Sequence, residues 1–510
     1  MLGTPKNFCA LHASRTKLDG LATASNIGET FWASMLSARQ ILVVLLLGWA
    51  CHGRAAVSLG PLFEDFKLTL DLGHRTEILG PLYYSEHRDT QWQFAVPPLF
   101  SWTEDPSVEA QEFDFLYPLL TYDRYGPEHR FQILQVFAFA GGQTQNEIQK
   151  HRFTLFPIYF QQWSADPKLN YWALVPVYGH LENRLFHDDI RFIFFPLYAR
   201  THKRDMVTDN FLYPVFHVRH GNALHGWQVW PLVGHEHKEP TTRTNALDET
   251  EIVGGHDKLF VLWPFFFNSK LGLGTENPEW QQAFLPFYSI NRSPNRDSAT
   301  YFWPFGLTIT DDREKKFHEI GAPWPLIVFA HGEGKTTRRF WPLFSRSHNA
   351  TLESDFYLWP VYKYNRYHSD PLDRARTRIL LFLYSDISEK NTSTGIEATR
   401  KDFWPLYTAR RDFDGNERLQ FLSLLEPILP NSKSIERNYS PIWAVWRSEK
   451  NVQKGVSSQS LLWNLYRCDI TPERKKCSFF FGVFQRETTA HGKSWRLFYI
   501  PMGKKKKDAE

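Results

Sequence analysis

A short motif of an aromatic residue, a proline and an aliphatic residue recurs along the whole chain and limits the folds open to it. The stretch RRFWPLFSRS, residues 338–347, holds one copy. About 23 complete or degraded copies follow one another from residue 61 onward, and most of them lie 16 to 23 residues apart. Proline breaks a helix interior, so this frequency of proline among β-branched and aromatic neighbours excludes α-helix as the main element. The repeat therefore predicts an all-β protein.

Trp-Pro is the most regular form of the motif. The residue after the proline is mostly Leu, Val, Ile or Phe, and the next is usually Tyr or Phe. The pairs that define the repeat are Trp230 and Pro231, Trp263 and Pro264, Trp303 and Pro304, Trp324 and Pro325, Trp341 and Pro342, Trp359 and Pro360, and Trp404 and Pro405.

The spacing of the copies predicts how the strands are connected. A period near 20 leaves room for one strand of about ten residues and one polar connection in each copy. Connections such as RSHNATLESD are rich in Asn, Ser and charged residues, as turns require. No helical crossover lies between copies, so the sequence predicts an antiparallel up-and-down meander of about 20 or more strands.

The motif is expected at the centre of each strand. Because side chains alternate between the two faces of a strand, Trp341 and Leu343 should point one way while Phe340 and Phe344 point the other. Both faces would then be apolar at mid-strand and polar at both ends. The proline would bend every strand at the same height.

Two architectures could bury such strands. A large β-barrel in an outer membrane fits the strand number, the abundance of Tyr and Trp and the mean hydropathy of −0.42. Apolar residues on both faces argue against it, because a wide barrel encloses water. A β-propeller-like or stacked-sheet array buries inner strands on both faces, but proline suits only edges and bulges. We expect the barrel and keep the array as the alternative.

The N-terminal region carries a targeting signal. Residues 41–50, ILVVLLLGWA, are apolar, follow Arg39 and precede the small residues Gly53 and Ala55. This is the pattern of a secretory signal peptide that begins at Met35 and is cleaved after Ala55, with an uncleaved signal anchor as the alternative. We expect a non-native or disordered extension at 1–34, the signal peptide at 35–55, a single β-repeat domain at 56–503 and a basic disordered tail at 504–510.

Cysteine placement agrees with export. Cys9 and Cys51 fall in the part expected to be lost, which leaves Cys468 and Cys477. These two flank the polar turn DITPERKK, so antiparallel pairing of the adjoining segments would bring their sulfur atoms together. We predict a hairpin disulfide, which is stable in an oxidising compartment, with two free thiols as the alternative.

No sequence feature indicates catalysis. The chain lacks a phosphate-binding loop, a nucleophile elbow and a paired-cysteine metal motif. The best constellation is the long interval after Pro231, which holds His235, His237 and His256. Imidazoles at this spacing could bind zinc or copper, although a solvated loop is the simpler interpretation. We therefore expect neither an enzyme nor a cofactor.

Charge and composition narrow the class of partner. The 59 basic residues nearly balance the 55 acidic ones and form no basic stripe, so nucleic acid is not an expected partner. We expect an exported protein associated with a bacterial outer membrane, with a transport or envelope-structural role. The alternative is a soluble periplasmic or secreted scaffold that binds a small solute or a glycan.

Overall fold

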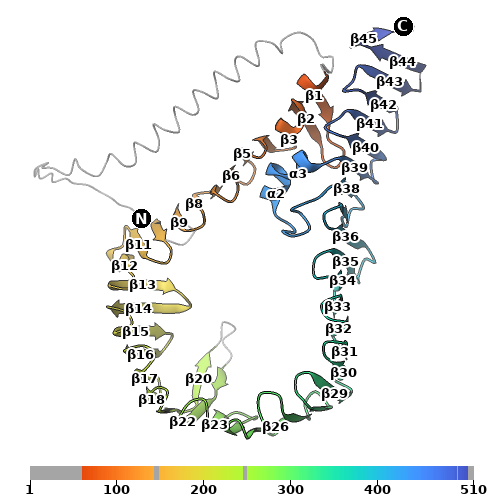
Figure 1. Ribbon diagram of the computed structural model, residues 1–510. Coiled ribbons are helices and arrows are strands. Elements are labelled where there is room, and N and C mark those ends of the chain that lie inside the picture. The colour runs from red at the N-terminus through yellow and green to blue at the C-terminus, as the bar shows by residue number, and fades with distance from the viewer. Residues whose placement is uncertain (1–59, 143–148, 245–249, 491, 503–510) are drawn as a thin grey trace, which may run out of the picture. The chain divides into compact units, whose positions relative to one another are not determined.

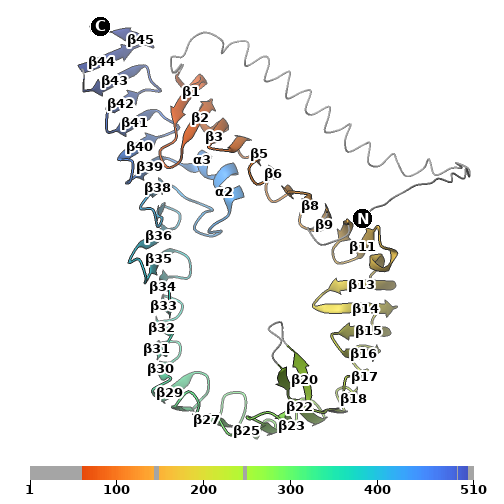
Figure 2. The ribbon, with the colours of Figure 1, turned by 180° about the vertical axis from the view of Figure 1, so that it is seen from behind.

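The computed structural model describes residues 60–142, 149–244, 250–490 and 492–502. Within these ranges, 43 strands form one antiparallel sheet, and β20 and β21 pair separately as a hairpin. Successive strands lie side by side in chain order (Figure 1), and the view from behind shows the same order (Figure 2). The predicted all-β antiparallel meander is confirmed.

The strands are short, with three to eight residues each. Those up to the hairpin are β1 (Glu64–Lys67), β2 (Gly73–Ile78), β3 (Tyr83–Arg88), β4 (Gln91–Val96), β5 (Phe100–Asp105), β6 (Ala110–Phe115), β7 (Leu120–Tyr125), β8 (Glu128–Ile133), β9 (Phe137–Gly142), β10 (Lys150–Leu155), β11 (Tyr159–Ser164), β12 (Tyr171–Leu174), β13 (Tyr178–Arg184), β14 (His187–Ile193), β15 (Tyr198–Lys203), β16 (Met206–Phe211), β17 (Phe216–Gly221), β18 (Leu224–Val229), β19 (Val233–Lys238), β20 (Thr241–Thr244) and β21 (Thr250–Val253).

The later strands continue the same sheet. They are β22 (Gly255–Val261), β23 (Phe266–Leu273), β24 (Glu279–Phe284), β25 (Tyr288–Arg292), β26 (Arg296–Tyr301), β27 (Leu307–Asp312), β28 (Phe317–Gly321), β29 (Ile327–Gly332), β30 (Thr336–Phe340), β31 (Phe344–His348), β32 (Leu352–Tyr357), β33 (Tyr362–Ser369), β34 (Leu372–Ile379), β35 (Tyr384–Asn391), β36 (Glu397–Phe403), β37 (Tyr407–Arg411), β38 (Glu417–Phe421), β39 (Trp446–Asn451), β40 (Val456–Leu461), β41 (Tyr466–Thr471), β42 (Arg474–Phe479), β43 (Phe484–Thr489), β44 (Gly492–Leu497) and β45 (Ile500–Met502). The helices are α2 (Lys433–Asn438), α3 (Ser440–Trp443) and the 3-10 turns η1 (Gly60–Leu62), η2 (Gly80–Leu82) and η3 (Pro167–Leu169).

The sheet is open. β1 pairs with β2 and β45 pairs with β44, but no pairing joins β1 to β45. The hydrogen-bonded closure that a β-barrel requires is therefore absent from the described strands. Among the described residues, none of the helices is long and apolar enough to cross a membrane. The extension, the signal peptide and the basic tail expected from the sequence lie outside these residues.

The motif lies in turns, and the prediction that it sits inside strands is wrong. Each copy of about 20 residues forms two strands rather than one, with the motif between them. In RRFWPLFSRS, β30 ends at Phe340, Trp341 to Leu343 form the turn, and β31 begins at Phe344. Proline has no N–H to give to a strand ladder, so a turn is the position that tolerates it best.

The other Trp-Pro pairs follow the same rule. All of them lie in connections between strands, namely Trp230 and Pro231, Trp263 and Pro264, Trp303 and Pro304, Trp324 and Pro325, Trp359 and Pro360, and Trp404 and Pro405. The expectation of strands that are buried at mid-length and polar at both ends is also wrong. The strand ends beside these turns are apolar and partly exposed, as at Phe340 and Phe344, which are 41% and 39% exposed.

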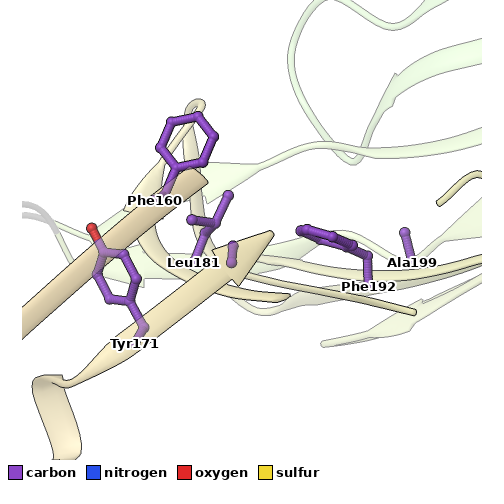
Figure 3. Packing of buried hydrophobic residues seen from close by; sticks show 6 residues of the cluster. Phe160, Tyr171, Leu181, Phe192 and Ala199 are labelled. Carbon is purple, nitrogen blue, oxygen red and sulfur yellow. The ribbon is translucent and has the colours of Figure 1, made fainter. Parts of the chain in front are cut away.

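Close packing occurs on one face of the sheet, one residue in from the turns. An apolar cluster of buried residues spans β11 to β15 and includes Tyr171 and Leu181 (Figure 3). Part of the cluster is a row of directly opposed residues in which small residues separate the two phenylalanines, namely Phe160, Ala173, Gly179, Phe192 and Ala199. Gly179 has no room for a side chain, because a β carbon there would lie 2.3 Å from Ala173 Cβ. The backbone at Gly179 is thus closely packed against Ala173 and Phe192, as in a protein interior.

Candidate functional site

The connections between strands are sorted by chemistry onto the two edges of the sheet. In an up-and-down antiparallel sheet, every second connection lies at the same edge. The motif connections all fall at one edge, which we call the aromatic edge. It consists of residues 79–82, 97–99, 116–119, 134–136, 156–158, 175–177, 194–197, 212–215, 230–232, 262–265, 285–287, 302–306, 322–326, 341–343, 358–361, 380–383, 404–406, 462–465, 480–483 and 498–499. The longer segment 422–445, which contains α2 and α3, leaves the same edge.

The aromatic edge is uncharged. None of its twenty connections contains Asp, Glu, His, Lys or Arg, and the strand residues that flank them are apolar, Tyr or Gly. Many of the side chains are exposed, including Phe302 at 70%, Phe305 at 60% and Leu358 at 58%. A contiguous exposed apolar surface of this kind usually marks a contact with another molecule or a membrane.

The opposite edge is polar. Its connections include 313–316, with the sequence REKK, and 412–416, with the sequence DFDGN. An ion pair between Lys316 Nζ and Glu333 at 2.9 Å joins two neighbouring connections there. Isolated apolar residues such as Phe186 also occur at this edge, without the regular spacing of the aromatic edge. The sheet is therefore amphipathic along the direction of its strands.

Neighbouring turns of the aromatic edge are tied together. The Leu358 N–H donates to the Leu343 carbonyl oxygen at 2.6 Å, and the Trp359 N–H donates to the Pro342 carbonyl oxygen at 2.8 Å. The Trp341 and Trp359 rings have their centroids 6.1 Å apart, within the range of a favourable aromatic contact. The carbonyl oxygens of five motif prolines accept from the next connection at this edge in the same way, namely those of Pro176, Pro196, Pro231, Pro342 and Pro405.

Many of these turns keep a large side chain where glycine would be easier. The first residue of the turn has a positive φ in a dozen of them, namely Leu79, Leu116, Leu134, Phe194, Leu212, Leu262, Phe302, Leu358, Leu380, Leu462, Phe480 and Phe498. The left-handed region costs about 1–2 kcal/mol for a residue that carries a β carbon. The chain accepts this strain to hold Leu or Phe on its surface, which favours a function for the exposed side chain.

The three histidines proposed as metal ligands do not converge. β19 pairs with β22 so that His237 lies opposite Asp257 and Lys238 lies opposite His256. Opposite residues share a face, so His256 lies on the face away from His235 and His237. Each imidazole has its own carboxylate partner, with distances of 2.8 Å for His235 and Asp257, 3.1 Å for His237 and Glu239, and 2.6 Å for His256 and Glu236. The part of the chain that the structure describes holds no group of three or more His, Cys, Asp or Glu side chains suited to a metal ion.

The expected disulfide is present. Cys468 on β41 and Cys477 on β42 lie directly opposite each other and are bonded through their sulfur atoms. The intervening residues 472–473 form the turn of the hairpin, as the polar sequence predicted.

The first and last parts of the sheet meet through buried charges. Arg437 of α2 donates to Thr103 Oγ1 at 2.8 Å and Asp114 Oδ2 at 2.9 Å, and also pairs with Glu112. The Tyr84 hydroxyl donates to the Arg437 carbonyl oxygen at 2.9 Å, and burial raises the pKa of Tyr84 to about 12. Both ribbon views place α2 beside the first strands (Figures 1 and 2).

A cavity of about 190 Å³ adjoins this contact. Its lining includes Arg75, Arg88, Arg418, Arg437 and Arg447, and each of these guanidinium groups is paired with a carboxylate. The charges of these five arginines are compensated by carboxylates of the same chain. The cavity therefore belongs to the contact between the first strands and the region around α2.

Comparison with known proteins does not assign the chain to a family. No protein-family model matches the chain, and no curated protein sequence is significantly similar to it. The aromatic edge is therefore the feature from which a function must be argued. The residues of this edge are recognisable as a repeat in the sequence, although the repeat was predicted to lie inside strands. The missing N–H donor of proline was the signal that the motif forms turns.

Proposed function

We propose that the protein is an exported, membrane-associated component of a bacterial envelope, with a structural rather than catalytic role. Its aromatic edge enters one leaflet of a lipid surface, while the sheet and its polar edge stay in water. The observation that carries this proposal is the absence of Asp, Glu, His, Lys and Arg from all twenty motif connections, whose side chains are widely exposed. Trp and Tyr, which are frequent at this edge, favour the interface between lipid and water.

The depth of the apolar zone favours insertion over crossing. The zone comprises a turn and one flanking residue on each strand, and the next residue inward is often polar, such as Arg339 beside Phe340. A strand that crosses a bilayer needs about 9–11 residues, whereas these strands have three to eight. Interfacial segments bury their apolar side only about 5–10 Å into the boundary of headgroups and acyl chains, which this edge matches.

Vesicle binding tests the proposal. A triple variant, Leu262→Glu, Phe302→Glu and Leu358→Glu, places charges on three turns of the aromatic edge, where the side chains are 55%, 70% and 58% exposed. We expect its partitioning onto phosphatidylcholine vesicles to fall by at least about tenfold, because burying a carboxylate in lipid is costly. Co-sedimentation with vesicles measures the change.

The matched control places the same charges on the polar edge. Leu72→Glu, Leu185→Glu and Phe186→Glu change side chains that are 66%, 61% and 92% exposed. This variant should bind vesicles like the unaltered protein. Equal loss in the two variants, or no vesicle binding by the unaltered protein, would contradict the proposal and leave a soluble scaffold as the better hypothesis.

A soluble scaffold that binds glycans is the second candidate. Exposed rings also occur within strands, such as Trp163 on β11 and Trp172 on β12, which are 42% and 47% exposed. Such rings can stack on sugars, and the Trp172 and Tyr178 centroids lie only 5.3 Å apart. Retention on a glycan panel that disappears in Trp172→Ala would support this function over lipid binding.

A further inference from the structure

Three basic side chains gather on one face of β33 and β34. Lys363 on β33 lies directly opposite Arg378 on β34, and Arg376 lies two residues before Arg378 on the same face. Ser385 of β35 lies opposite Arg378 on its other side. Directly opposed residues have their β carbons about 4.5–5.5 Å apart, and like charges in this position are destabilising.

None of these three cations forms an ion pair among the described residues, although the more distant charge of Asp402 acts on Arg376 and partly opposes the lowering of its pKa. Other basic residues of the same strands form ion pairs, since Arg366 pairs with Asp373 at 2.7 Å and Arg374 pairs with Glu389 at 3.0 Å. The contrast shows that the local sequence can place a carboxylate against an arginine. Lys363, Arg376 and Arg378, in contrast, have no carboxylate in ion-pair contact within the described part of the chain.

Three buried polar atoms on the same face have no hydrogen-bond partner, and besides Asn365 Oδ1, an acceptor on the residue opposite Arg376, two of them can donate. These two are Arg376 Nε and the Ser385 hydroxyl oxygen, and Ser385 is only 4% exposed. Burial, and then the charge of Arg378, lower the pKa of Lys363, and the same two causes lower the pKa of Arg376. Unpaired buried donors are uncommon in native proteins and call for an explanation.

The nearest carboxylate on this face is already committed. Asp402 lies opposite Ser385, but its oxygen atoms accept from Arg400 Nε at 2.8 Å and from Thr408 Oγ1 at 2.8 Å. Its charge is thus compensated by Arg400. An anion from outside the chain would find four donors and no free carboxylate.

We infer that Lys363, Arg376, Arg378 and Ser385 form a binding site for a phosphate group. A tetrahedral anion with several acceptor oxygens matches two guanidinium forks, one ammonium and one hydroxyl, which could each donate to it. Bound phosphate separates the like charges and satisfies the two buried donors.

The site lies close to the aromatic edge. Lys363 and Arg378 are the second strand residues from the turns 358–361 and 380–383. A strand rises about 3.3 Å per residue, so a turn that enters the leaflet would bring these cations to the level of lipid phosphates. Assignment of the phosphate to a lipid headgroup rests on the proposed function. Free phosphate is the other source of the same chemistry.

Titration with inorganic phosphate at constant ionic strength tests the site without a membrane. We expect calorimetric binding and a rise in melting temperature. Arg378→Gln should weaken binding by about tenfold or more through loss of a charge-assisted contact. The same variant should melt at an equal or higher temperature without phosphate, because it removes a repulsion. Lys390→Gln is the matched control, since Lys390 is exposed at the far end of β35 and forms no ion pair among the described residues.

Vesicles identify the source of the phosphate. Phosphatidic acid mixed with phosphatidylcholine should bind more protein than phosphatidylcholine alone, because its phosphate is not capped by choline and carries more negative charge, and Arg378→Gln should remove this difference. Phosphate binding without a preference for phosphatidic acid would assign the site to free phosphate. Failure to bind neutral vesicles, with phosphate binding intact, would contradict the proposed function only. No phosphate binding, or equal binding by Arg378→Gln, would overturn the site.

Discussion

Individual residues of the aromatic edge combine backbone strain with exposure of an apolar side chain to water. Leu358 has a φ of 47° and is 58% exposed. Glycine adopts this conformation without strain, and in an ordinary soluble turn it would be preferred. Leu343, in the neighbouring turn, is 49% exposed without a positive φ. The two leucines therefore differ in backbone strain, although both are exposed on the aromatic edge.

Replacing these leucines by glycine should have opposite effects on stability. Leu358→Gly relieves a strain of about 1–2 kcal/mol and loses about 0.5–1 kcal/mol through backbone entropy. We expect the free energy of unfolding to rise by up to about 1.5 kcal/mol. Leu343→Gly should lower it by about 0.5–1 kcal/mol. Urea denaturation measures both changes. Vesicle binding should weaken in both variants, and a Leu358→Gly protein that is less stable would contradict the assignment of strain.

At the scale of strands and turns, the sequence defined the fold class but not the repeat unit. A 20-residue period fits one ten-residue strand with one connection, and it fits equally two six-residue strands with two connections. The apolar stretch around Trp341 resembles a buried strand centre, because turns in most soluble proteins are polar. Only the proline distinguishes a turn from a strand centre here, because proline has no N–H to donate to a neighbouring strand. The disulfide between Cys468 and Cys477 could be predicted from the sequence, because the polar turn that brings the two cysteines together lies between them in the chain.

The positions of the histidines and of the phosphate site could not be predicted in this way. Strand pairing sets which face each side chain takes, and a shift of one residue moves a side chain to the other face. His256 is separated from His235 because of the register between β19 and β22. Lys363 and Arg378 come together through the register of β33 and β34. No spacing in the sequence contains that information.

The packed row across β11 to β15 should carry much of the local stability. Phe192 is 5% exposed between Gly179 and Ala199, and its removal leaves a cavity among small neighbours. We expect Phe192→Ala to lower the free energy of unfolding by about 3–5 kcal/mol. Phe186→Ala, at a position 92% exposed, should change it by less than about 0.5 kcal/mol. Similar losses in both variants, measured by urea denaturation, would show that the row is not a core.

For the molecule as a whole, side-chain contacts rather than strand pairing join the first strands to the last ones, through the ion pairs of Arg437 and hydrogen bonds such as that from Thr69 Oγ1 to Ser458 Oγ at 2.7 Å. Residues 60–142 contain 13 acidic and 5 basic residues, whereas residues 417–502 contain 7 acidic and 13 basic ones. Arg437 concentrates this complementarity, since its side chain is 9% exposed and pairs with an Asp114 side chain that is 4% exposed. Opposite net charge in the two regions favours their association at low ionic strength.

Loss of this contact should release the first strands. We expect Arg437→Met to lower the free energy of unfolding by about 3–5 kcal/mol, because it leaves the buried Asp114 carboxylate without its positively charged partner, with hydrogen bonds only from Asn438 and Ser101. Hydrogen exchange in β3 to β6 should accelerate as the contact opens. Arg191→Met breaks an ion pair whose arginine is 63% exposed, so it should cost less than about 1 kcal/mol. Unchanged exchange in β3 to β6 of Arg437→Met would contradict a joining role.

The alternation of the two kinds of connection also restricts how such a chain can change its length in evolution. Removing or duplicating a complete copy, which is a pair of strands, leaves every later Trp-Pro turn on its original side. Removing a single strand would reverse the direction of all strands that follow and carry their exposed rings to the opposite side, among charged loops. Chains of this design should therefore differ in length by even numbers of strands, in steps of about 20 residues.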